Sequence, residues 1–490
     1  MGLFDFWKKK PAPSDSPKEA APVEPYAIGP VPAGLRRIEV VRARNGRSAA
    51  QWNYQRTLEL DGASVRESTA NNVGGVERLF ERFATDFPSD AEARTSFDSQ
   101  VALLSRNFPF VTRHDRDVPL PKWKAGAVPF TSHPELEAAL DSARDDAGFE
   151  AAARVYTDWL VGQGDPRGEI FSLAGQLRWD DLRAFDDANA RVVWGALDST
   201  LGAEVHSLEW RSGILVGASL KRRTIDSPWG LVDVTQAFLA HPLARFVTRL
   251  RFGLENYEGD NDWGRVLKTL GESGRAHALR SLRFDDYGSE DSELSWTNYG
   301  DLQDGWSKLS GLEELVLRAG GDGNLGALEL PNLRKFVRET GGLRSHELTD
   351  ITRAKWPKLE HLEVWFGEPG AYGGDCTPDQ AWKFVQDGVP PTVTTLALKN
   401  CSFLGALLPR LITWPGLSRL RTLDLSLGTL GDTEAAVLLA STAELKHLER
   451  LDLRENGLSA ARVAELKAAL PNAVLDDQRE ANTRYVAVGE

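Results

Sequence analysis

Three glycines offer the most familiar chemistry in this sequence. Gly321, Gly323 and Gly326 have the spacing G-x-G-x-x-G and follow the apolar run LVLR, as do loops that cradle the pyrophosphate of a dinucleotide. Such a site needs a helix to begin at the last glycine, so that the helix N-terminus faces the pyrophosphate. Only ALELPN separates Gly326 from the next apolar run at Leu333. We therefore expect a tight turn here and no bound cofactor.

A second set of reactive side chains lies in VYTDWLVGQGDPRGE, which carries Asp158, Asp165, Arg167 and Glu169. An acid, a base and a cation this close together could support catalysis. Alternatively, Asp165 and Pro166 form a turn that Arg167 locks by pairing with nearby carboxylates. We favour the turn, because paired carboxylates without a pocket are usually structural.

The histidines and cysteines are not spaced like metal ligands. The eight histidines form no H-x-x-x-H pair, and the two cysteines, Cys376 and Cys401, lie apart. Neither G-x-S-x-G nor a P-loop occurs. We predict no metal, no cofactor and no catalytic residues, and hence a protein that is not an enzyme.

Composition narrows the classes of partner and the location. A net charge of -13 disfavours a large nucleic-acid surface, which needs a basic face. The scarcity of cysteine, and an opening MGLFDFWKKK whose lysines follow its apolar residues, predict a reducing cytoplasm and no secretory signal. No apolar run approaches the roughly 20 residues that span a bilayer, so we expect no integral membrane association.

The elements that would position any site fall into five segments. Residues 1–34, rich in proline and alanine, predict a disordered tether, whose MGLFDFWKKK end could also dock on a protein or a membrane surface. Residues 35–112 combine alternating strands, a turn at Asp61-Gly62 and a helix capped by Ser89, which predicts a small α+β domain. Residues 113–132 are a linker, residues 133–199 a helical segment, and residues 200–490 a series of repeats.

The repeats consist of short runs of the form L-x-x-L-x-L. Their starting residues are separated by 21 to 34 residues, a period typical of stacked supersecondary units. The runs begin at Val247, Leu279, Leu312, Leu333, Leu359, Val393, Leu420 and Leu448. The pattern predicts one strand per unit, with helices such as SAARVAELKAAL between the strands of the last units.

Three parts of the chain resemble known families. Residues 200–490 resemble bacterial leucine-rich-repeat proteins with repeats of the ribonuclease-inhibitor type, and VYTDWLVGQGDPRGE is similar to a bacterial repeat-companion segment. Residues 35–112 resemble a degenerate WGR domain that lacks the Trp-Gly-Arg signature. The resemblance implies an α/β leucine-rich-repeat solenoid, with parallel strands on its concave face and helices or loops on its convex face.

In such a solenoid the strand residues between the inward leucines face a partner. Arginine and aromatic residues dominate binding hot spots, and we expect either Trp365 or Phe366 to face outward. The candidate partner-binding residues are Arg251, Arg283, Asp285, Arg318, Lys335, Glu363, Trp365, Phe366, Lys399 and Asp424. The early units are basic and the last two are more acidic.

The sequence thus predicts a non-enzymatic scaffold that binds a protein partner through the concave face of the repeats. The alternative is a nucleic-acid-associated protein that acts through the WGR-like residues 35–112. Salt-dependent binding of DNA or RNA would distinguish the second hypothesis from the first.

Four residues within the repeats raise structural questions. Arg338 stands where an apolar residue is normal, so either its strand is shifted by one residue or the arginine is buried with an acidic partner. Asn456 and Cys401 occupy the ninth position, where this repeat uses Asn or Cys to bond loop backbone, so Cys401 is interpreted as a buried structural thiol. Cys376 lies in a glycine-rich loop, and the sequence assigns it no role.

Overall fold

We describe a computed structural model of the chain. The structure describes residues 35–46, 52–73, 76–119, 130–143, 145–194, 205–222, 229–257, 259, 261–321, 323–483 and 485–489. The predicted tether, including MGLFDFWKKK, lies outside these residues. The chain divides into two compact units, Met1–Lys122 (unit 1) and Trp123–Glu490 (unit 2).

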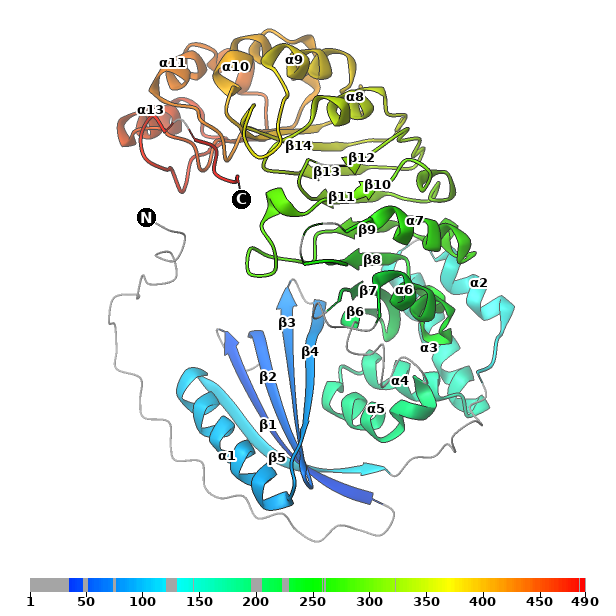
Figure 1. The fold of residues 1–490 in the computed structure, drawn as a ribbon. Helices are drawn as coiled ribbons and strands as arrows, with labels where there is room; N and C mark the ends of the chain where they lie inside the picture. Colours follow the sequence, from blue (N-terminus) through cyan, green and yellow to red (C-terminus); the bar gives the residue numbers. More distant parts are fainter. Residues whose placement is uncertain are drawn as a thin grey trace. The chain divides into compact units, whose positions relative to one another are not determined.

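Unit 1 is an antiparallel sheet with one helix (Figure 1). The strands adjoin in the order β5-β1-β2-β3-β4. Their bounds are β1 Leu35–Gly46, β2 Trp52–Asp61, β3 Ser64–Val73, β4 Val76–Asp86 and β5 Phe110–Pro119, and the helix is α1 Asp90–Asn107. The predicted hairpin is confirmed, because β2 and β3 pair up to Asp61 and Ser64.

The helix of unit 1 also matches its sequence. Ser89 caps α1 by accepting a hydrogen bond from the Glu92 backbone N–H at 3.3 Å, as predicted. Phe97, Val101 and Leu104 of α1 are buried in a core cluster with strand residues of the sheet. The helix therefore covers one face of the sheet with the three apolar residues that its periodicity selects.

The end of unit 1 differs from the prediction. Strand β5 continues to Pro119 and pairs with β1, so residues 113–119 belong to the sheet and not to the linker predicted from residue 113. The segment FVTRHDRDVP can form a strand despite its many charges because they pair with charges on the neighbouring strand. For example, Arg37 Nε lies 2.8 Å from Asp117 Oδ1. Strand β4 was likewise not predicted.

Unit 2 begins with helices, as expected for residues 133–199, and then a β-hairpin. The helices are α2 Pro134–Ser142, α3 Asp146–Gln163, α4 Pro166–Gly175 and α5 Trp179–Val193. The antiparallel hairpin is β6 Val205–Arg211 and β7 Ile214–Leu220. Strand β7 is fully buried and also pairs in parallel with the next strand.

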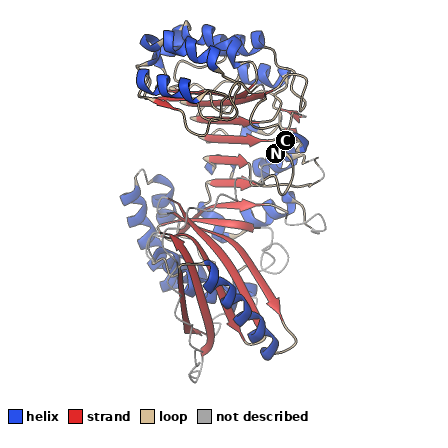
Figure 2. Ribbon diagram, turned by 90° about the vertical axis from the view of Figure 1, so that its left-hand side faces the viewer, coloured by secondary structure: helices blue, strands red, loops and turns tan. Residues whose placement is uncertain are grey.

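From β7 onward the strands of unit 2 are parallel and follow one another in sequence order (Figures 1 and 2). The strands are β8 Arg249–Phe252, β9 Ser281–Phe284, β11 Glu314–Arg318, β13 Lys335–Glu339, β14 His361–Gly367, β15 Thr395–Cys401, β16 Thr422–Asp424, β17 Arg450–Asp452 and β18 Ala473–Val474. All eight predicted repeat strands are present and begin two residues after the first apolar residue of each run. Their inward leucines join one continuous core cluster.

Helices connect many of these strands and lie along one side of the sheet (Figure 1). They are α6 Leu231–Ala240, α7 Trp263–Glu272, α8 Ser345–Arg353, α9 Pro378–Asp387, α10 Leu404–Ile412, α11 Asp432–Ala440, α12 Thr442–Leu445 and α13 Ala460–Ala469. Among the described residues, no helix combines the length and apolarity needed to cross a membrane.

The glycine motif forms a turn. Gly323 and Asn324 make the short strand β12, which pairs in parallel with β10 (Gly300–Asp301), and Gly326 has φ +66°, a conformation that favours glycine. No helix occurs in residues 324–334, all of which the structure describes. The expected tight connection is confirmed, because the segment lacks the helix N-terminus that would face a pyrophosphate.

Candidate functional site

The candidate site is the face of the unit 2 sheet that points away from the inward leucines. We call it the strand face, and its side chains alternate with the core residues along each strand from β8 to β17. It comprises Arg249, Arg251, Ser281, Arg283, Glu314, Val316, Arg318, Lys335, Val337, Glu339, His361, Glu363, Trp365, Thr395, Ala397, Lys399, Thr422, Asp424, Arg450 and Asp452. Because the strands are in register, these side chains form rows across the sheet.

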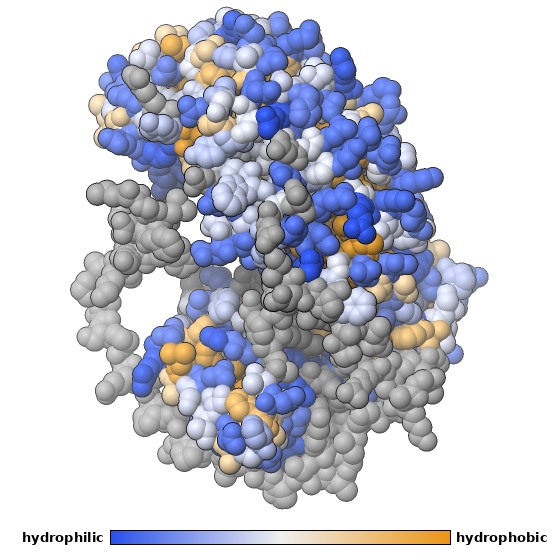
Figure 3. Space-filling view, in the orientation of Figure 1, coloured by the Kyte–Doolittle hydropathy of each residue, from blue (hydrophilic) through white to orange (hydrophobic). Residues whose placement is uncertain are grey.

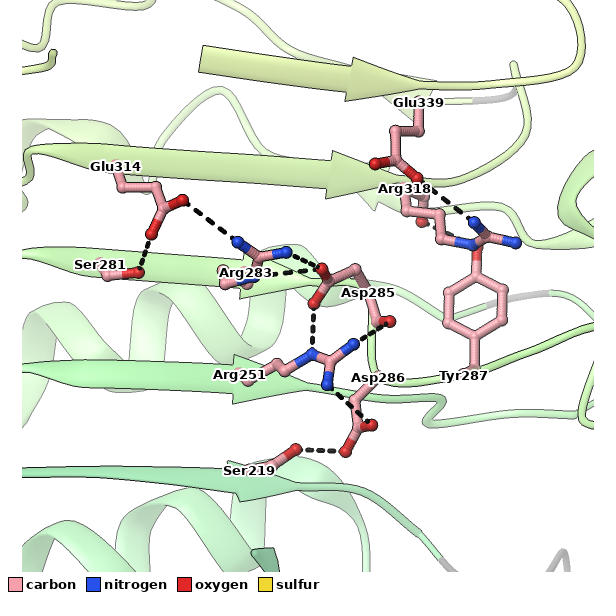
Figure 4. A network of polar contacts seen from close by, with 10 residues as sticks. All are labelled: Ser219, Arg251, Ser281, Arg283, Asp285, Asp286, Tyr287, Glu314, Arg318 and Glu339. Atoms are coloured by element: carbon pink, nitrogen blue, oxygen red, sulfur yellow. Dashed lines mark hydrogen bonds and ion pairs between the residues drawn. The ribbon is translucent and has the colours of Figure 1, made fainter. Parts of the chain in front are cut away.

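The first part of the strand face is an ion-pair network (Figure 4). Arg251 Nε lies 2.6 Å from Asp285 Oδ1 and its Nη1 lies 3.4 Å from Asp286 Oδ1. Asp286 also accepts a hydrogen bond from Ser219 on β7. Arg251, from β8, is thus held by carboxylates that follow β9.

Arg283 extends the network toward β11 and β13. It pairs with Asp285 and, through Nη1, with Glu314 Oε1 at 3.1 Å. Glu314 in turn lies 3.0 Å from Lys335 Nζ and accepts a hydrogen bond from Ser281 Oγ at 2.7 Å. Burial alone would raise the pKa of Glu314, but these hydrogen bonds and cations outweigh it and lower that pKa.

Arg318 closes the network at the strand ends. Its Nη1 lies 3.2 Å from Glu339 Oε2, and its guanidinium lies over the Tyr287 ring at 5.4 Å from the centroid. Burial raises the pKa of Glu339 despite the charge of Arg318. The predicted basic character of the early units is therefore neutralised within the protein, because each of these arginines has an acidic partner on a neighbouring unit.

The network covers apolar residues of the strand face. Val316 and Val337 are buried, although they lie outside the main core cluster and are direct register partners on β11 and β13. The aliphatic stems of flanking arginine and lysine side chains can shield such residues from water. Figure 3 shows a mainly hydrophilic surface over unit 2, with small apolar areas between charged residues.

Trp365 lies on the strand face next to two charged residues. Its Nε1 donates to Glu363 Oε1 at 2.7 Å, and Lys399 Nζ lies 4.9 Å from its ring centroid and 3.1 Å from Glu363 Oε1. Burial would raise the pKa of Glu363, but hydrogen bonds from His361 and Trp365 and the charge of Lys399 lower it to about 2. Only 7% of Trp365 is exposed, so Lys399 must move for a partner to reach the ring.

Phe366 is not a partner-binding residue, which corrects the prediction. It is 1% exposed and packs edge-on against Phe384 and Phe403, with the Phe403 centroid at 5.6 Å. Strand β14 continues to Gly367, so its alternation turns Phe366 to the same side as the inward Leu362 and Val364. Trp365 is the aromatic residue that takes the outward position.

The last two strands of the strand face, β16 and β17, each carry one acidic side chain, Asp424 and Asp452. Asp452 lies 2.8 Å from Arg450 Nη2 and 2.7 Å from Arg454 Nη2. Asp424 accepts a hydrogen bond from the Ser426 backbone N–H at 2.9 Å, and burial raises the pKa of its carboxyl. Asp424 is therefore a carboxylate that a cationic group of a partner would stabilise.

Sequence reasoning missed Glu314 and Glu339, which hold the network together. Glu314 could have been predicted from the sequence, because it occupies the same position in its run as Lys335, a predicted residue, does in the next run. Asp286 lies beyond the end of β9, where strand periodicity assigns no face.

Arg338 is buried with an acidic partner, the second of the two alternatives. Both Arg338 and Glu347 side chains are 0% exposed, and Nε lies 2.9 Å from Glu347 Oε2. The guanidinium also donates to the carbonyls of Ala319 and Gly320 at 2.8 and 2.6 Å, and Tyr299 Oη donates to Glu347 Oε1 at 2.7 Å. The strand is not shifted, because Arg338 pairs in register with Leu317 and Val364.

The repeat-companion segment VYTDWLVGQGDPRGE forms a turn held by Arg167, which is the alternative that the sequence analysis favoured over a catalytic cluster. Asp165 caps α4 by accepting from the Arg167 backbone N–H at 3.0 Å, and its carboxylate lies 2.7 Å from Arg167 Nη2. Thr131 N–H donates to the same carboxylate at 2.7 Å. Asp158 and Glu169 are absent from these contacts, so the structure does not bring the four predicted residues into one cluster.

Both cysteines are buried and free. Burial raises the pKa of each thiol, which disfavours a reactive thiolate. Asn456 donates to the carbonyls of Leu425 and Leu453 at 2.9 and 3.1 Å, so the predicted loop-bonding role of the ninth position is confirmed for asparagine.

Several described arginines of unit 1 also have acidic partners. Arg113 bridges Glu39 and Asp98, and Arg66 Nη1 lies 3.3 Å from Asp61 Oδ2. Such pairing reduces the positive charge that phosphates would meet. Nucleic-acid binding by residues 35–112 stays a prediction.

No protein-family model and no curated protein matches the chain. Among solved structures, a crystal structure of a Bacteroides fragilis protein from a structural genomics consortium matches 92% of this chain and 100% of its own, with a TM-score of 0.53 and 16% identity. An internalin from Listeria monocytogenes matches 55% of this chain and 87% of its own at 15% identity, but its TM-score of 0.20 supports no conclusion. The chain is a mixed α/β protein with a large, mainly parallel sheet, and it shares its fold, at this level of similarity, with the Bacteroides fragilis protein.

Proposed function

We propose that unit 2 is a leucine-rich-repeat solenoid that binds a protein partner through the strand face as its concave surface, without catalysis. The observation that carries the proposal is the continuous, in-register face from β8 to β17, with Trp365 among charged rows. Large aligned faces of this kind suit extended contacts with another protein.

The ion-pair network supports recognition of a partner with complementary charge. Arg318 and Glu339 are each partly exposed, at 26% and 21% of their side chains, and can exchange an internal partner for an external one. Exchanging an internal ion pair for one with the partner changes the free energy of binding little, whereas placing like charges opposite each other costs several kcal/mol. The network therefore contributes more to specificity than to affinity.

The chemistry of the face also favours binding over catalysis. Two of its carboxylates, Glu314 and Glu363, are engaged by arginine or lysine, and both have a lowered pKa. A general acid or base at neutral pH needs a carboxyl pKa raised toward 7.

The test is capture of a partner from the source cell by full-length chain and by the double variant Arg318→Ala/Trp365→Ala. We expect the variant to lose the partner while keeping its melting temperature within a few degrees. A matched control, Arg410→Ala/Trp296→Ala, removes the same residue types from α10 and from the exposed end of the 3-10 helix Leu294–Trp296 and should retain the partner. Full retention by the first variant would contradict the assignment of the strand face.

A further inference from the structure

Residues after β18 cross the ends of several strands. We call residues 479–483 and 485–489 the strap, and the residues beneath them, Gly341, Asn400, Leu427, Gly428 and Glu455–Gly457, the loop edge. The Arg479 backbone N–H donates to Asn456 O at 2.8 Å, and the Asn482 N–H donates to Gly457 O at 2.6 Å. The strap thus starts beside the loop that follows β17.

The strap then proceeds across the loops after β16 and β15. The Ala487 N–H donates to Leu427 O at 3.1 Å, and the Val488 N–H donates to Asn400 Oδ1 at 2.9 Å. Asn400 returns the contact by donating its side-chain amide to Val488 O. One asparagine side chain therefore pairs with both the N–H and the C=O of a single strap residue, as a neighbouring strand would.

The last described residue of the strap fits a site that admits no side chain. A Cβ built on Gly341 would lie 2.1 Å from Gly489 O, and a Cβ built on Gly489 would lie 2.4 Å from the Tyr372 ring. Both distances are shorter than any real carbon contact; the first is to backbone, so Gly341 must lack a side chain while the strap is bound, and the second is to the ring of Tyr372, which a larger residue in place of Gly489 would have to displace. The loop edge thus selects both backbone direction and residue size.

These contacts combine backbone hydrogen bonds with the packing of the partly buried Val488 side chain against the core. No described residue of the strap is buried, and Tyr485 is 73% exposed. Asn400, in contrast, is 0% exposed, and its amide would lose its strap partner if the strap left. That burial is measured with the strap in place, and an occupant that supplies a peptide N–H and C=O would restore both hydrogen bonds of the Asn400 amide, so the loop edge favours a peptide backbone.

We propose that the loop edge is a peptide-binding site, distinct from the strand face, for an extended segment of a partner protein. The segment would end in the pattern aliphatic, small, aliphatic, glycine, as Val486, Ala487, Val488 and Gly489 do. The strap occupies the site within the same chain and thereby competes with the partner. Extended peptides recognised by backbone hydrogen bonds, with small pockets that select residue size, are an established mode of binding.

The test measures binding of a fluorescein-labelled peptide of residues 479–489 to three full-length proteins. Val488→Pro removes the N–H that Asn400 accepts, whereas Val488→Ala trims the side chain and keeps that N–H. We expect the Val488→Pro protein to bind the peptide at least about tenfold more tightly than the wild type and Val488→Ala do, because only its strap is released. A peptide carrying Gly489→Val should not bind.

Hydrogen exchange at Ala487 accompanies the binding measurement. Faster exchange in Val488→Pro, without peptide binding, would overturn the proposal and leave the strap as a structural cover. Unchanged exchange would also overturn it, because the Asn400 contact would not hold the strap. If Val488→Pro fails to fold, the test is to add excess peptide to the wild-type protein. The peptide should displace the strap and thereby accelerate hydrogen exchange at the Ala487 N–H. Unchanged exchange would refute the proposal.

Discussion

Unit 2 holds charge in two different ways. The pair Arg338–Glu347 lies fully inside the molecule, whereas the network around Arg251, Arg283 and Asp285 lies on the strand face, with arginine side chains 34% exposed. The interior pair has one arrangement, fixed by backbone carbonyls and by Tyr299. In the face network Asp285 and Glu314 are each shared by two cations, so its members can exchange partners. The contrast separates charge that specifies the fold from charge that is available to a partner.

The largest expected effect is on the interior pair. Glu347→Leu leaves Arg338 buried without its counter-ion and should lower the free energy of unfolding by about 3 to 5 kcal/mol. Urea denaturation measures the loss. The double variant Arg338→Leu/Glu347→Leu removes both charges and should recover most of it, and a double variant as unstable as the single one would show that the carbonyl contacts of Arg338 matter more than its charge.

A smaller effect is expected where the face network converges. Asp285→Asn keeps the size of the side chain but removes the negative charge between Arg251 and Arg283, and should cost about 2 kcal/mol of unfolding free energy. Thermal and urea melts check this value. A loss as large as that of Glu347→Leu would contradict the view that the network can redistribute its contacts to Asp286 and Glu314.

The dependence of stability on pH should reveal the contribution of the Glu363 carboxylate to the free energy of unfolding. Its pKa is lowered from 4.5 to about 2 in the folded protein, so its contribution is present above pH 4.5 and is lost as pH falls toward 2. We expect Glu363→Gln to flatten the decline in unfolding free energy over that interval by about 1 to 2 kcal/mol. Parallel curves for wild type and variant would show that Lys399 and His361 do not act on this carboxylate.

The smallest effect is expected for an exposed pair. Arg421 Nη2 lies 2.7 Å from Glu449 Oε1, with side chains 66% and 59% exposed. Arg421→Ala should change the unfolding free energy by less than about 0.5 kcal/mol. A change above 1 kcal/mol in a urea melt would mean that exposure alone does not rank the ion pairs of this protein.

Local pattern was sufficient to predict the repeat strands. The apolar residues of each L-x-x-L-x-L run, such as Leu312, Leu315 and Leu317, all enter the core, because strand alternation is a property of neighbouring residues. The cap at Ser89 and the turn at Gly326 were predictable for the same reason.

Contacts between units could not be predicted in the same way. The partner of Arg251 is Asp285, 34 residues later, and it becomes a neighbour only through the parallel register of β8 and β9. The sequence left open which of Trp365 and Phe366 faces outward, because both lie beyond the six-residue pattern of the run; β14 continues to Gly367 and settles that Phe366 faces inward. For β5, cross-strand pairs compensate charges that resemble a linker when the sequence is read alone.

The order of the strands has a consequence for how unit 2 loses structure. From β7 to β18 the strands of the large sheet adjoin in chain order, while β10 and β12 pair only with each other. Opening one end therefore removes a single interface at a time, as in an array of nearest neighbours. The strap links the loops after β17, β16 and β13 and the end of β15. The strap therefore connects four repeat units, and unfolding from the β18 end should begin with release of the strap.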